Sequence, residues 1–361
     1  MLSSASYLPR LWMGSQISTK LLPSAIRPLT AHLKFTENCQ ARCISCDYWK
    51  SRWPDVISTD RAIALLNEID ALGIHALRLT GGEPLLRKDL FEILSKANTS
   101  NFKRIIMQTN GLLLKKLHKQ INDSPITQVA VSIDGLKESN DVIRGIRGYF
   151  DLGIEGMKLL RNKELVLSVT LNRMSVTELR QLAIAAQEVG AKIEYNILSR
   201  SLSFFANADL DAMWPERQDI GEIETFLRDT LKRPKYEVDY VTRYYNHEAM
   251  AEPPCVLGFL QVFVLSNGDV LTGCYPLKPV GNIMQNGLAE ILGSEAYHQQ
   301  AVAMIRRECP GCTCGVESSL AMKHAASGAF FELSRLLQKP NHVDQAAVTA
   351  THRPTIASPA K

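Results

Sequence analysis

The chain has 361 residues, 45% of them hydrophobic, and its 41 basic and 37 acidic residues leave a net charge of +4. This length and composition allow a full hydrophobic core, while the near balance of charge gives no argument for a nucleic-acid partner or an anionic membrane surface. No stretch approaches the roughly 18–20 consecutive apolar residues of a membrane span. The eight cysteines are too sparse for a disulfide scaffold. Because they cluster, we expect them to bind metal in a reducing cytoplasm.

The first 30 residues differ in composition from the rest of the chain. They contain basic residues and several serines but no acidic residue, which slightly resembles an organelle transit peptide. The absence of a continuous apolar segment argues against a secretory signal. We expect instead an N-terminal arm whose apolar residues, such as Leu8 and Trp12, pack onto the main domain.

Between residues 31 and 200, six short apolar runs alternate with longer patterns of helical periodicity. The runs predict strands at residues 32–36, 76–80, 104–108, 128–133, 166–171 and 193–198. The first helix has Ser58 as its predicted N-cap and ends before Gly73. Six βα units in series predict an α/β fold with a parallel sheet, best described as a partial (β/α)6 TIM-like barrel. Ligands of such a barrel bind at the C-terminal ends of its strands.

The remainder of the chain predicts a connector and a small second module. A helical stretch is expected near residues 219–231, followed by an aromatic and charged run at 236–247. A β-hairpin is predicted at residues 261–272, with its turn at 266–269, and two short helices follow it. The expected segments are an arm (1–30), a core barrel (31–200), a connector (201–254), a cysteine-containing module (255–315), a helix (316–338) and a disordered tail (339–361).

Three cysteines, Cys39, Cys43 and Cys46, directly follow the first predicted strand with the spacing C-x3-C-x2-C. Four thiolates would complete a zinc site or fill every corner of an iron–sulfur cluster. Three leave one iron of a [4Fe–4S] cluster without a protein ligand, so another molecule can bind there. The spacing therefore indicates a reactive site rather than a structural one.

A second motif, Gly81-Gly82-Glu83-Pro84, follows the second predicted strand. Together with the cysteine triplet it resembles the radical S-adenosylmethionine (SAM) superfamily, and the resemblance covers about residues 31–200. It implies that the triplet binds a [4Fe–4S] cluster and that the amino and carboxylate groups of SAM bind its open iron. It also implies that SAM is cleaved to a 5′-deoxyadenosyl radical, which abstracts hydrogen from a substrate.

The same resemblance implies contacts to SAM. Backbone carbonyls of Gly81 and Gly82 and the carboxylate of Glu83 would accept hydrogen bonds from the SAM ammonium. Glycines allow a close approach, and Pro84 biases Glu83 toward extended backbone. Asn110 lies in a T-N-G element after the third predicted strand and would lie near SAM.

Further contacts are implied at the ends of the later strands. Ser132 would contact the SAM ribose or carboxylate, and Arg144 would pair with the carboxylate, a task for which a guanidinium suits. Arg147 is the alternative to Arg144. Ribose or adenine contacts are also expected from Asn172, Leu198, Tyr48 and Trp49. Ser45, before the third cysteine, departs from the aromatic residue of many relatives and leaves the adenine packing open.

The C-terminal cysteines form a second group. Their order, with Gly268 and Gly281-Asn282-Ile283 between them, resembles the SPASM and twitch extensions of this superfamily, which hold auxiliary iron–sulfur clusters. A single auxiliary [4Fe–4S] cluster would be bound by Cys255, Cys274, Cys309 and Cys312, with Cys314 as the alternative to either of the last two. Structural zinc is the other interpretation of these thiolates.

These features predict an enzyme that needs an electron donor such as flavodoxin or ferredoxin. Because only about thirty residues precede the first strand, we expect no separate peptide-recognition domain and favour a small-molecule, dehydrogenase-like oxidation or rearrangement. The alternative is a maturase that modifies a peptide, protein or cofactor precursor. A non-catalytic iron–sulfur protein is a third hypothesis, which the Gly-Gly-Glu-Pro motif disfavours because such a protein would not need to bind SAM.

Overall fold

The computed structural model describes residues 28–50, 56–198, 210–248, 255, 257–274 and 277–308. The predictions for the N-terminal arm, the last helix and the C-terminal tail lie outside these residues. So do the proposed ligands Cys309, Cys312 and Cys314.

Six parallel strands form one part of the sheet, in the order β6-β5-β4-β3-β2-β1. Their bounds are β1 (Thr30–Lys34), β2 (Ala76–Thr80), β3 (Arg104–Thr109), β4 (Gln128–Ser132), β5 (Glu164–Leu171) and β6 (Lys192–Ile197). Every neighbouring pair is parallel, and each strand end lies within about two residues of its prediction. The α/β fold with a TIM-like partial barrel is therefore confirmed.

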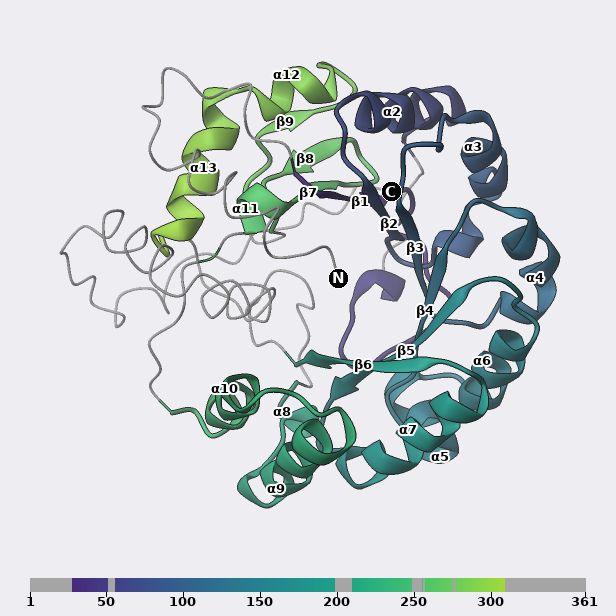
Figure 1. Cartoon of the computed structure of the whole chain (residues 1–361), viewed down its shortest axis with the longest axis vertical. Helices are drawn as coiled ribbons and strands as arrows, with labels where there is room; N and C mark the ends of the chain where they lie inside the picture. Colours follow the sequence, from purple (N-terminus) through teal and green to yellow (C-terminus); the bar gives the residue numbers. More distant parts are fainter. Residues whose placement is uncertain are drawn as a thin grey trace.

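Helices cover the outer face of this curved sheet (Figure 1). They are α2 (Thr59–Ala71), η3 (Pro84–Leu86), α3 (Leu90–Lys96), α4 (Leu114–Asp123), α5 (Lys137–Arg144), α6 (Tyr149–Lys158), η4 (Val176–Glu178) and α7 (Leu179–Glu188). The predicted start of α2 is confirmed, because the Ser58 side chain accepts a hydrogen bond from the backbone N–H of Arg61. Gly73 follows the helix with a φ of 69°, which explains why it ends there.

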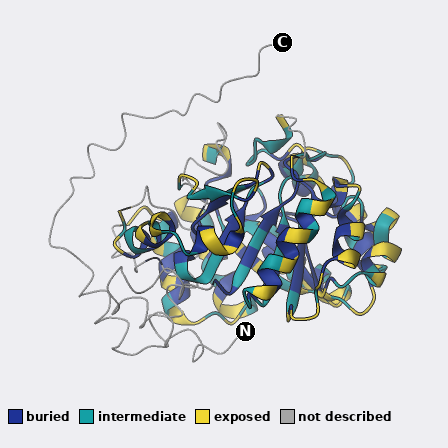
Figure 2. Ribbon diagram, turned by 90° about the horizontal axis from the view of Figure 1, so that it is seen from above, coloured by how far each residue is buried: buried dark blue, intermediate teal, exposed yellow. Residues whose placement is uncertain are grey.

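The two faces of the parallel strands carry different residues. Leu33, Leu77 and Met107 lie on the outer face and are fully buried in the main hydrophobic core beneath the helices. Buried residues accordingly concentrate on the strands and on the helix sides that face them (Figure 2). The register places Arg78 and Gln108 on the opposite, inner face, where their side chains are hydrogen-bonded at 3.3 Å. The barrel interior is therefore partly polar, as a ligand-binding cavity requires.

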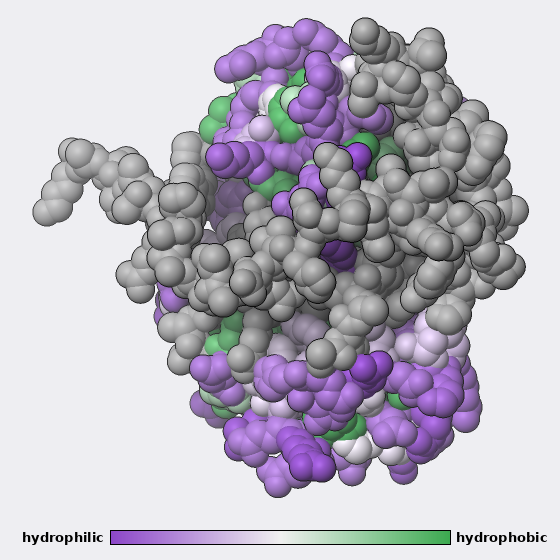
Figure 3. All heavy atoms as spheres, turned by 90° about the vertical axis from the view of Figure 1, so that its left-hand side faces the viewer, coloured by the Kyte–Doolittle hydropathy of each residue, from purple (hydrophilic) through white to green (hydrophobic). Residues whose placement is uncertain are grey.

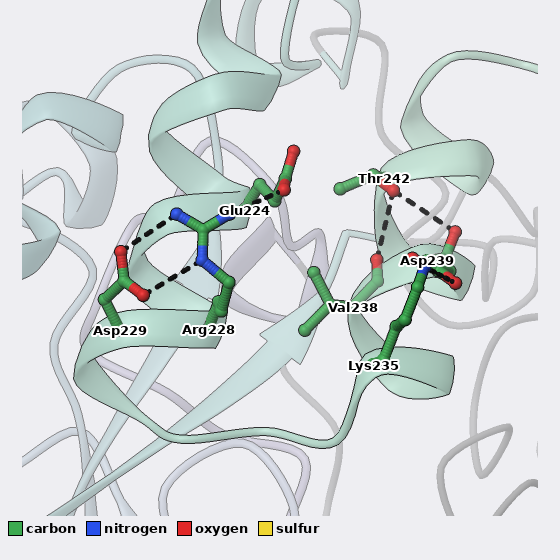
Figure 4. A network of polar contacts seen from close by, with 7 residues as sticks. All are labelled: Glu224, Arg228, Asp229, Lys235, Val238, Asp239 and Thr242. Atoms are coloured by element: carbon green, nitrogen blue, oxygen red, sulfur yellow. Dashed lines mark hydrogen bonds and ion pairs between the residues drawn. The ribbon is translucent and has the colours of Figure 1, made fainter.

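The connector is helical and consists of α8 (Leu210–Met213), α9 (Arg217–Thr225), the π-helical turn η5 (Phe226–Thr230) and α10 (Lys235–Tyr245). The helical stretch was predicted, and the aromatic run that follows it is also a helix. Their exposed side carries ion pairs within and next to each helix, including Arg228 with Glu224 and Lys235 with Asp239 (Figure 4). Exposed pairs of this kind contribute about 0–1 kcal/mol each. The lower end of the face in Figure 3, where α9 and α10 lie, is mostly hydrophilic.

The C-terminal module begins with α11 (Leu257–Leu260) and the predicted hairpin, β7 (Gln261–Val264) and β8 (Asp269–Leu271). It continues with β9 (Gly281–Asn282), α12 (Leu288–Leu292) and α13 (Glu295–Ile305). Strand β7 pairs in parallel with β1, so the hairpin and β9 extend the barrel sheet to nine strands, and the sheet is not closed in the described residues. The sequence did not predict this pairing. In the described part of the chain, every helix is too short or too polar to span a membrane.

Candidate active site

The cysteine triplet lies in residues 35–47, here called the cysteine loop, which packs against the end of β2. The carbonyl oxygens of Thr36 and Asn38 accept hydrogen bonds from the N–H groups of Gly82 (2.9 Å) and Glu83 (2.8 Å). A Cβ added to either glycine of the motif would lie 2.2 Å from a backbone oxygen of the loop. The expectation assigned these glycines to the close approach of SAM. In the structure they admit the cysteine loop, and their expected role toward SAM stays a prediction.

The other side of the cysteine loop is bound to the end of α5. The N–H groups of Arg42 and Ile44 donate to the carbonyl oxygens of Arg144 (3.0 Å) and Ile143 (2.9 Å). Gly145, with a φ of 68°, lies so close that an added Cβ would be 2.4 Å from the Arg42 carbonyl oxygen. A loop without regular structure is thus held by backbone hydrogen bonds to two separate elements of the barrel.

The three cysteines contact one small apolar group. Cys43 is buried, and Cys39 and Cys46 contact the same small apolar group, which contains Ala41 and Tyr149. None of the described cysteines forms a disulfide. Burial raises the pKa of Cys39 to about 12 and that of Cys46 to about 11. In the protein alone these groups are therefore thiols, and a bound cation would displace their protons.

The surroundings of the cysteines fit an iron–sulfur cluster. Asn110 Nδ2 lies 3.7 Å from Cys39 Sγ, and Arg144 Nη1 lies 3.8 Å from Cys43 Sγ, so donors already face the sulfur atoms. The Tyr149 hydroxyl and Arg144 Nε are buried without a hydrogen-bond partner. Among the described residues no His, Cys, Asp or Glu groups converge on a single ion. That is expected of thiolates which each hold a different iron.

Glu83 is fully buried, and both of its carboxylate oxygens accept hydrogen bonds from the chain itself. The donors are Leu85 N (3.1 Å), Thr109 Oγ1 (2.8 Å) and Asn110 N (2.7 Å). Burial raises the pKa of Glu83 to about 7, against these donors, which lower it. The carboxylate therefore joins the end of β2 to the end of β3. The expected contact of this carboxylate with the SAM ammonium stays a prediction.

Arg144 lies at the cysteine loop, at the C-terminus of α5. Its Nη2 is 2.8 Å from Asp134 Oδ2, and Asp134, which is buried, also accepts a hydrogen bond from the N–H of Thr170 at 2.7 Å. Arg147, the alternative from sequence, is exposed. Sequence analysis missed Asp134 as the partner of Arg144. The signal was present, because an aspartate directly after a buried strand requires a partner.

The other residues expected to contact SAM differ in their burial and in their hydrogen bonds. Ser132 is half-buried at the end of β4, in register with Ser168. Asn172 is fully buried, and its side-chain amide bonds to Thr170, Met174 and Ser175 in its own turn. Its polar atoms therefore already bond to the chain, and the expected ribose contact stays a prediction.

Leu198 and Tyr48 lie at opposite ends of the row of parallel strands. Leu198 is buried, and its backbone N–H donates to the Tyr245 hydroxyl at 2.9 Å. The Tyr48 hydroxyl accepts a hydrogen bond from Lys34 Nζ, which also lies 4.0 Å from the ring centroid. Trp49 Nε1 donates to the carbonyl oxygen of Cys43 at 3.3 Å. The two aromatic residues support the cysteine loop in this structure, and their expected adenine contacts stay predictions.

Lys34, the last residue of β1, is a charged residue that sequence analysis missed. It is only 1% exposed, and burial lowers its pKa from the usual value. Its Nζ lies 3.5 Å from Glu37 Oε2, and the other oxygen of Glu37 accepts a hydrogen bond from Ser266 in the hairpin turn. A lysine at the end of an apolar strand was the available signal. These contacts join the cysteine loop to the C-terminal hairpin.

Two of the C-terminal cysteines, Cys255 and Cys274, are buried in one small apolar group with Leu257 and Met304. They approach each other although nineteen positions separate them in sequence. This placement agrees with a shared metal centre, either a cluster or zinc.

Helix α2 holds the C-terminal module through one ion pair. Arg61 Nη1 lies 2.8 Å from Glu68 Oε1, and Arg61 Nε donates to the carbonyl oxygen of Ile283 at 3.0 Å. The second oxygen of Glu68 accepts from the N–H of Leu288, the first residue of α12, at 2.7 Å. A carboxylate at a helix N-terminus is favourable because it meets unpaired N–H groups and the positive end of the helix dipole.

Two family models match the chain where these two centres lie. The radical SAM superfamily matches residues 33–179, and the SPASM iron–sulfur cluster-binding domain matches residues 255–314. The chain is therefore a radical SAM enzyme with a C-terminal SPASM domain. Its cofactors are SAM and [4Fe–4S] clusters, as the resemblance implied. This disfavours both the zinc interpretation and a non-catalytic protein.

Among individual relatives, the AdoMet-dependent heme synthase of Methanosarcina barkeri is 25% identical over 336 residues, which cover 83% of this chain and 93% of that protein. The Fe-coproporphyrin III synthase of the same organism is 28% identical over 173 residues, but these cover only 45% of this chain and 43% of that protein. The sporulation killing factor maturation protein SkfB of Bacillus subtilis is 23% identical over 295 residues, covering 80% and 69%.

Two solved structures share the fold. Streptococcus suis SuiB bound to S-adenosylmethionine superposes with a TM-score of 0.58 at 15% identity, over 76% of this chain and 68% of SuiB. The protein anSMEcpe with bound AdoMet and the Cp18Cys peptide gives a TM-score of 0.56 at 17% identity, over 86% of this chain and all of that one (100%). At such low identity the likeness establishes the fold alone.

Proposed function

We propose that this enzyme is a maturase that oxidises a peptide or a cofactor precursor. Sequence analysis placed this alternative second to a small-molecule oxidation, a preference that depended on the short segment before β1. Relatives that this chain matches over two thirds or more of both lengths include one named for heme synthesis and one named for maturation of a killing factor. These names support maturation over a dehydrogenase-like reaction on a simple alcohol.

The observation that carries the proposal is the continuous sheet. The cysteine triplet follows β1, and β1 pairs directly with β7 of the hairpin that leads to Cys274. The contacts of Glu37 with Ser266 and of Glu68 with α12 fix the same arrangement from two other sides. Two cysteine centres held on neighbouring strands of one sheet can act on one substrate in the barrel. The first centre would serve the hydrogen abstraction, and the second would serve the electron transfer that completes the oxidation.

When bound, SAM and the first cluster supply a 5′-deoxyadenosyl radical that takes a hydrogen atom, and the auxiliary cluster supplies an acceptor for the second electron. The substrate thus loses one hydrogen atom, one electron and one proton, which is a two-electron oxidation. The chain contributes the ligands, the orientation and the exclusion of water from this site.

We propose the following assignments for these groups. The ligands of the first cluster are Cys39, Cys43 and Cys46. The auxiliary ligands are Cys255 and Cys274 together with Cys309 and Cys312 or Cys314. Backbone groups of Gly81–Pro84, with Asn110, Ser132 and Arg144, surround SAM. The matched regions support the predicted limits of the core at residues 31–200 and of the C-terminal module at 255–315.

The inner face of β6 offers a place for the substrate. Glu194 and Asn196 are exposed on this edge strand, and Asn196 Nδ2 donates to Ser168 Oγ on β5 at 2.8 Å. A polar and exposed inner face at the open side of a barrel suits a large polar substrate such as a peptide segment or a porphyrin. Flavodoxin or ferredoxin would reduce the cluster, and the reducing cytoplasm would preserve its thiolates.

The experiment uses anaerobically reconstituted protein with SAM and dithionite. We expect 5′-deoxyadenosine, and we expect its rate of formation to rise when a substrate is added. The probes are Fe-coproporphyrin III and any short peptide encoded beside the gene, and the product should be lighter by two hydrogen atoms. The Cys43→Ala variant serves as the inactive control. Intact clusters that yield no 5′-deoxyadenosine would contradict the radical mechanism, and stimulation only by simple alcohols would contradict the maturase.

A further inference from the structure

One buried hydroxyl near the cysteine triplet lacks a use in the chain itself. Tyr149, the first residue of α6, is fully buried, and its hydroxyl oxygen has no hydrogen-bond partner. A buried hydroxyl without a partner is unfavourable, whereas phenylalanine would fill the same space without that cost. The residue therefore indicates an acceptor that is not part of the polypeptide.

The neighbours of Tyr149 restrict what this acceptor is. The side chain belongs to the apolar group formed with Ala41 and Cys43, against which Cys39 and Cys46 also pack. The Arg144 guanidinium carbon lies 5.9 Å from the Tyr149 ring centroid, but a guanidinium can only donate hydrogen bonds. The group that accepts must therefore come from what the cysteines bind.

The backbone before α6 holds Tyr149 in this position. Asp141 accepts hydrogen bonds from the N–H groups of Gly148 (2.5 Å) and Tyr149 (2.9 Å) through its two carboxylate oxygens. Gly148 has a φ of 75°, which lets the chain turn from α5 into α6 at this point. The tyrosine is thus fixed by the same α5–α6 corner that binds the cysteine loop.

We propose that the Tyr149 hydroxyl donates a hydrogen bond to a sulfur atom of the cluster at Cys39, Cys43 and Cys46 and thereby raises its reduction potential. Reduction adds negative charge to the cluster, and a donor at sulfur stabilises that charge. Tyr149 is a positioning residue for the cluster rather than a catalytic one. The inference rests on a cluster at the triplet, and it does not depend on the proposed substrate.

The test compares Tyr149→Phe with the wild type in reconstituted holoenzyme. Redox titration followed by electron paramagnetic resonance gives the midpoint potential of each cluster, and the signal that changes on addition of SAM identifies the triplet cluster. Without SAM, we expect a lower midpoint potential in Tyr149→Phe at unchanged iron and sulfide content. The matched control is Tyr245→Phe, because Tyr245 is also buried but its hydroxyl donates to the carbonyl oxygen of Leu171 at 2.9 Å. That variant should keep the wild-type potential.

Two results would overturn the proposal in the loaded enzyme. One is an unchanged potential and unchanged SAM binding with the cluster intact. The other is an unchanged potential together with weaker SAM binding, which would assign the hydroxyl to SAM. A third measurement covers failure of the variant to load its cluster. Without cluster, Tyr149→Phe should melt at the wild-type temperature or above, because the hydroxyl has no partner there. A lower melting temperature would reveal a partner in the protein and refute the proposal. If the wild-type holoenzyme formed no 5′-deoxyadenosine, that result would count against the proposed function and would not bear on the hydrogen bond proposed here.

Discussion

Replacing Glu83 by glutamine tests how the second motif works. The carboxylate is fully buried and accepts hydrogen bonds from Leu85, Thr109 and Asn110. Glutamine has nearly the same shape, but its amide nitrogen cannot accept, so one of the three donors is left unpaired or faces another donor. An unpaired buried donor costs about 1–3 kcal/mol. At acidic pH, where the carboxyl group of the wild type is neutral, we therefore expect Glu83→Gln to be less stable by this amount.

The sign of the pH dependence follows from the pKa. In the folded protein the pKa of Glu83 is raised from 4.5 to about 7, so between these values the folded state binds the proton that the unfolded state has released. The free energy of unfolding of the wild type therefore falls as the pH rises through this window. At about 1.4 kcal/mol per pKa unit, the loss from about pH 5 to about pH 8 is about 2.5 kcal/mol. Glutamine does not titrate and escapes this loss.

The assay is urea unfolding of the cluster-free protein and of Glu83→Gln across this pH range. We expect the deficit of the variant to shrink by about 2.5 kcal/mol between the acidic and the basic end. Taking the difference between the two proteins removes the contributions of all other titrating groups. Parallel stability curves would refute the reasoning, because they would show that Glu83 ionises in the fold as it does in the unfolded chain.

Three further changes have defined outcomes. Gly82→Ala should lose most of its iron on reconstitution, because the added Cβ would lie 2.2 Å from the backbone of the cysteine loop; Gly221→Ala, with open space around it, should keep wild-type iron. Glu68→Gln should lower the urea midpoint by an amount that corresponds to about 1–3 kcal/mol of unfolding free energy, because it weakens the bonds to the C-terminal module. An unchanged midpoint would show that these bonds are dispensable. Combined Cys255→Ala and Cys274→Ala should remove the auxiliary iron but preserve SAM cleavage, measured as 5′-deoxyadenosine; loss of both would argue against two independent centres.

Much of the fold could be predicted because its signals are local. The six parallel strands are recognised in the sequence as apolar runs. Ser58 and Gly73 mark the ends of α2, because capping depends on residues close to the helix end. The pairing of β7 with β1 could not be predicted in this way. Those strands are more than two hundred residues apart in the sequence, and nothing in the hairpin itself specifies which edge of the barrel it meets.

The site shows the same division. The cysteine triplet and the second motif each lie within a few consecutive residues, so residue type and spacing alone indicate their chemistry. The other charged residues of the site find their partners far along the sequence. Asp134 meets Arg144 only after α5 has packed, and Lys34 contacts a glutamate and a tyrosine, the first of which also bonds to a distant hairpin turn. Sequence gives the type of each residue at a strand end, but three-dimensional packing decides which polar atoms are already used.

That distinction changes the meaning of the Gly-Gly-Glu-Pro motif. Its glycines admit the backbone of the cysteine loop, and its glutamate holds the next strand end, where Asn110 faces Cys39 Sγ at 3.7 Å. The motif therefore acts on the triplet twice, once through the loop that carries the cysteines and once through a donor at a sulfur. A loop with no regular structure needs such external support, because each thiolate has to meet its own iron. It follows that damage to this motif should weaken cluster binding before it weakens SAM binding, and iron content measured against SAM affinity in the Glu83→Gln variant distinguishes the two.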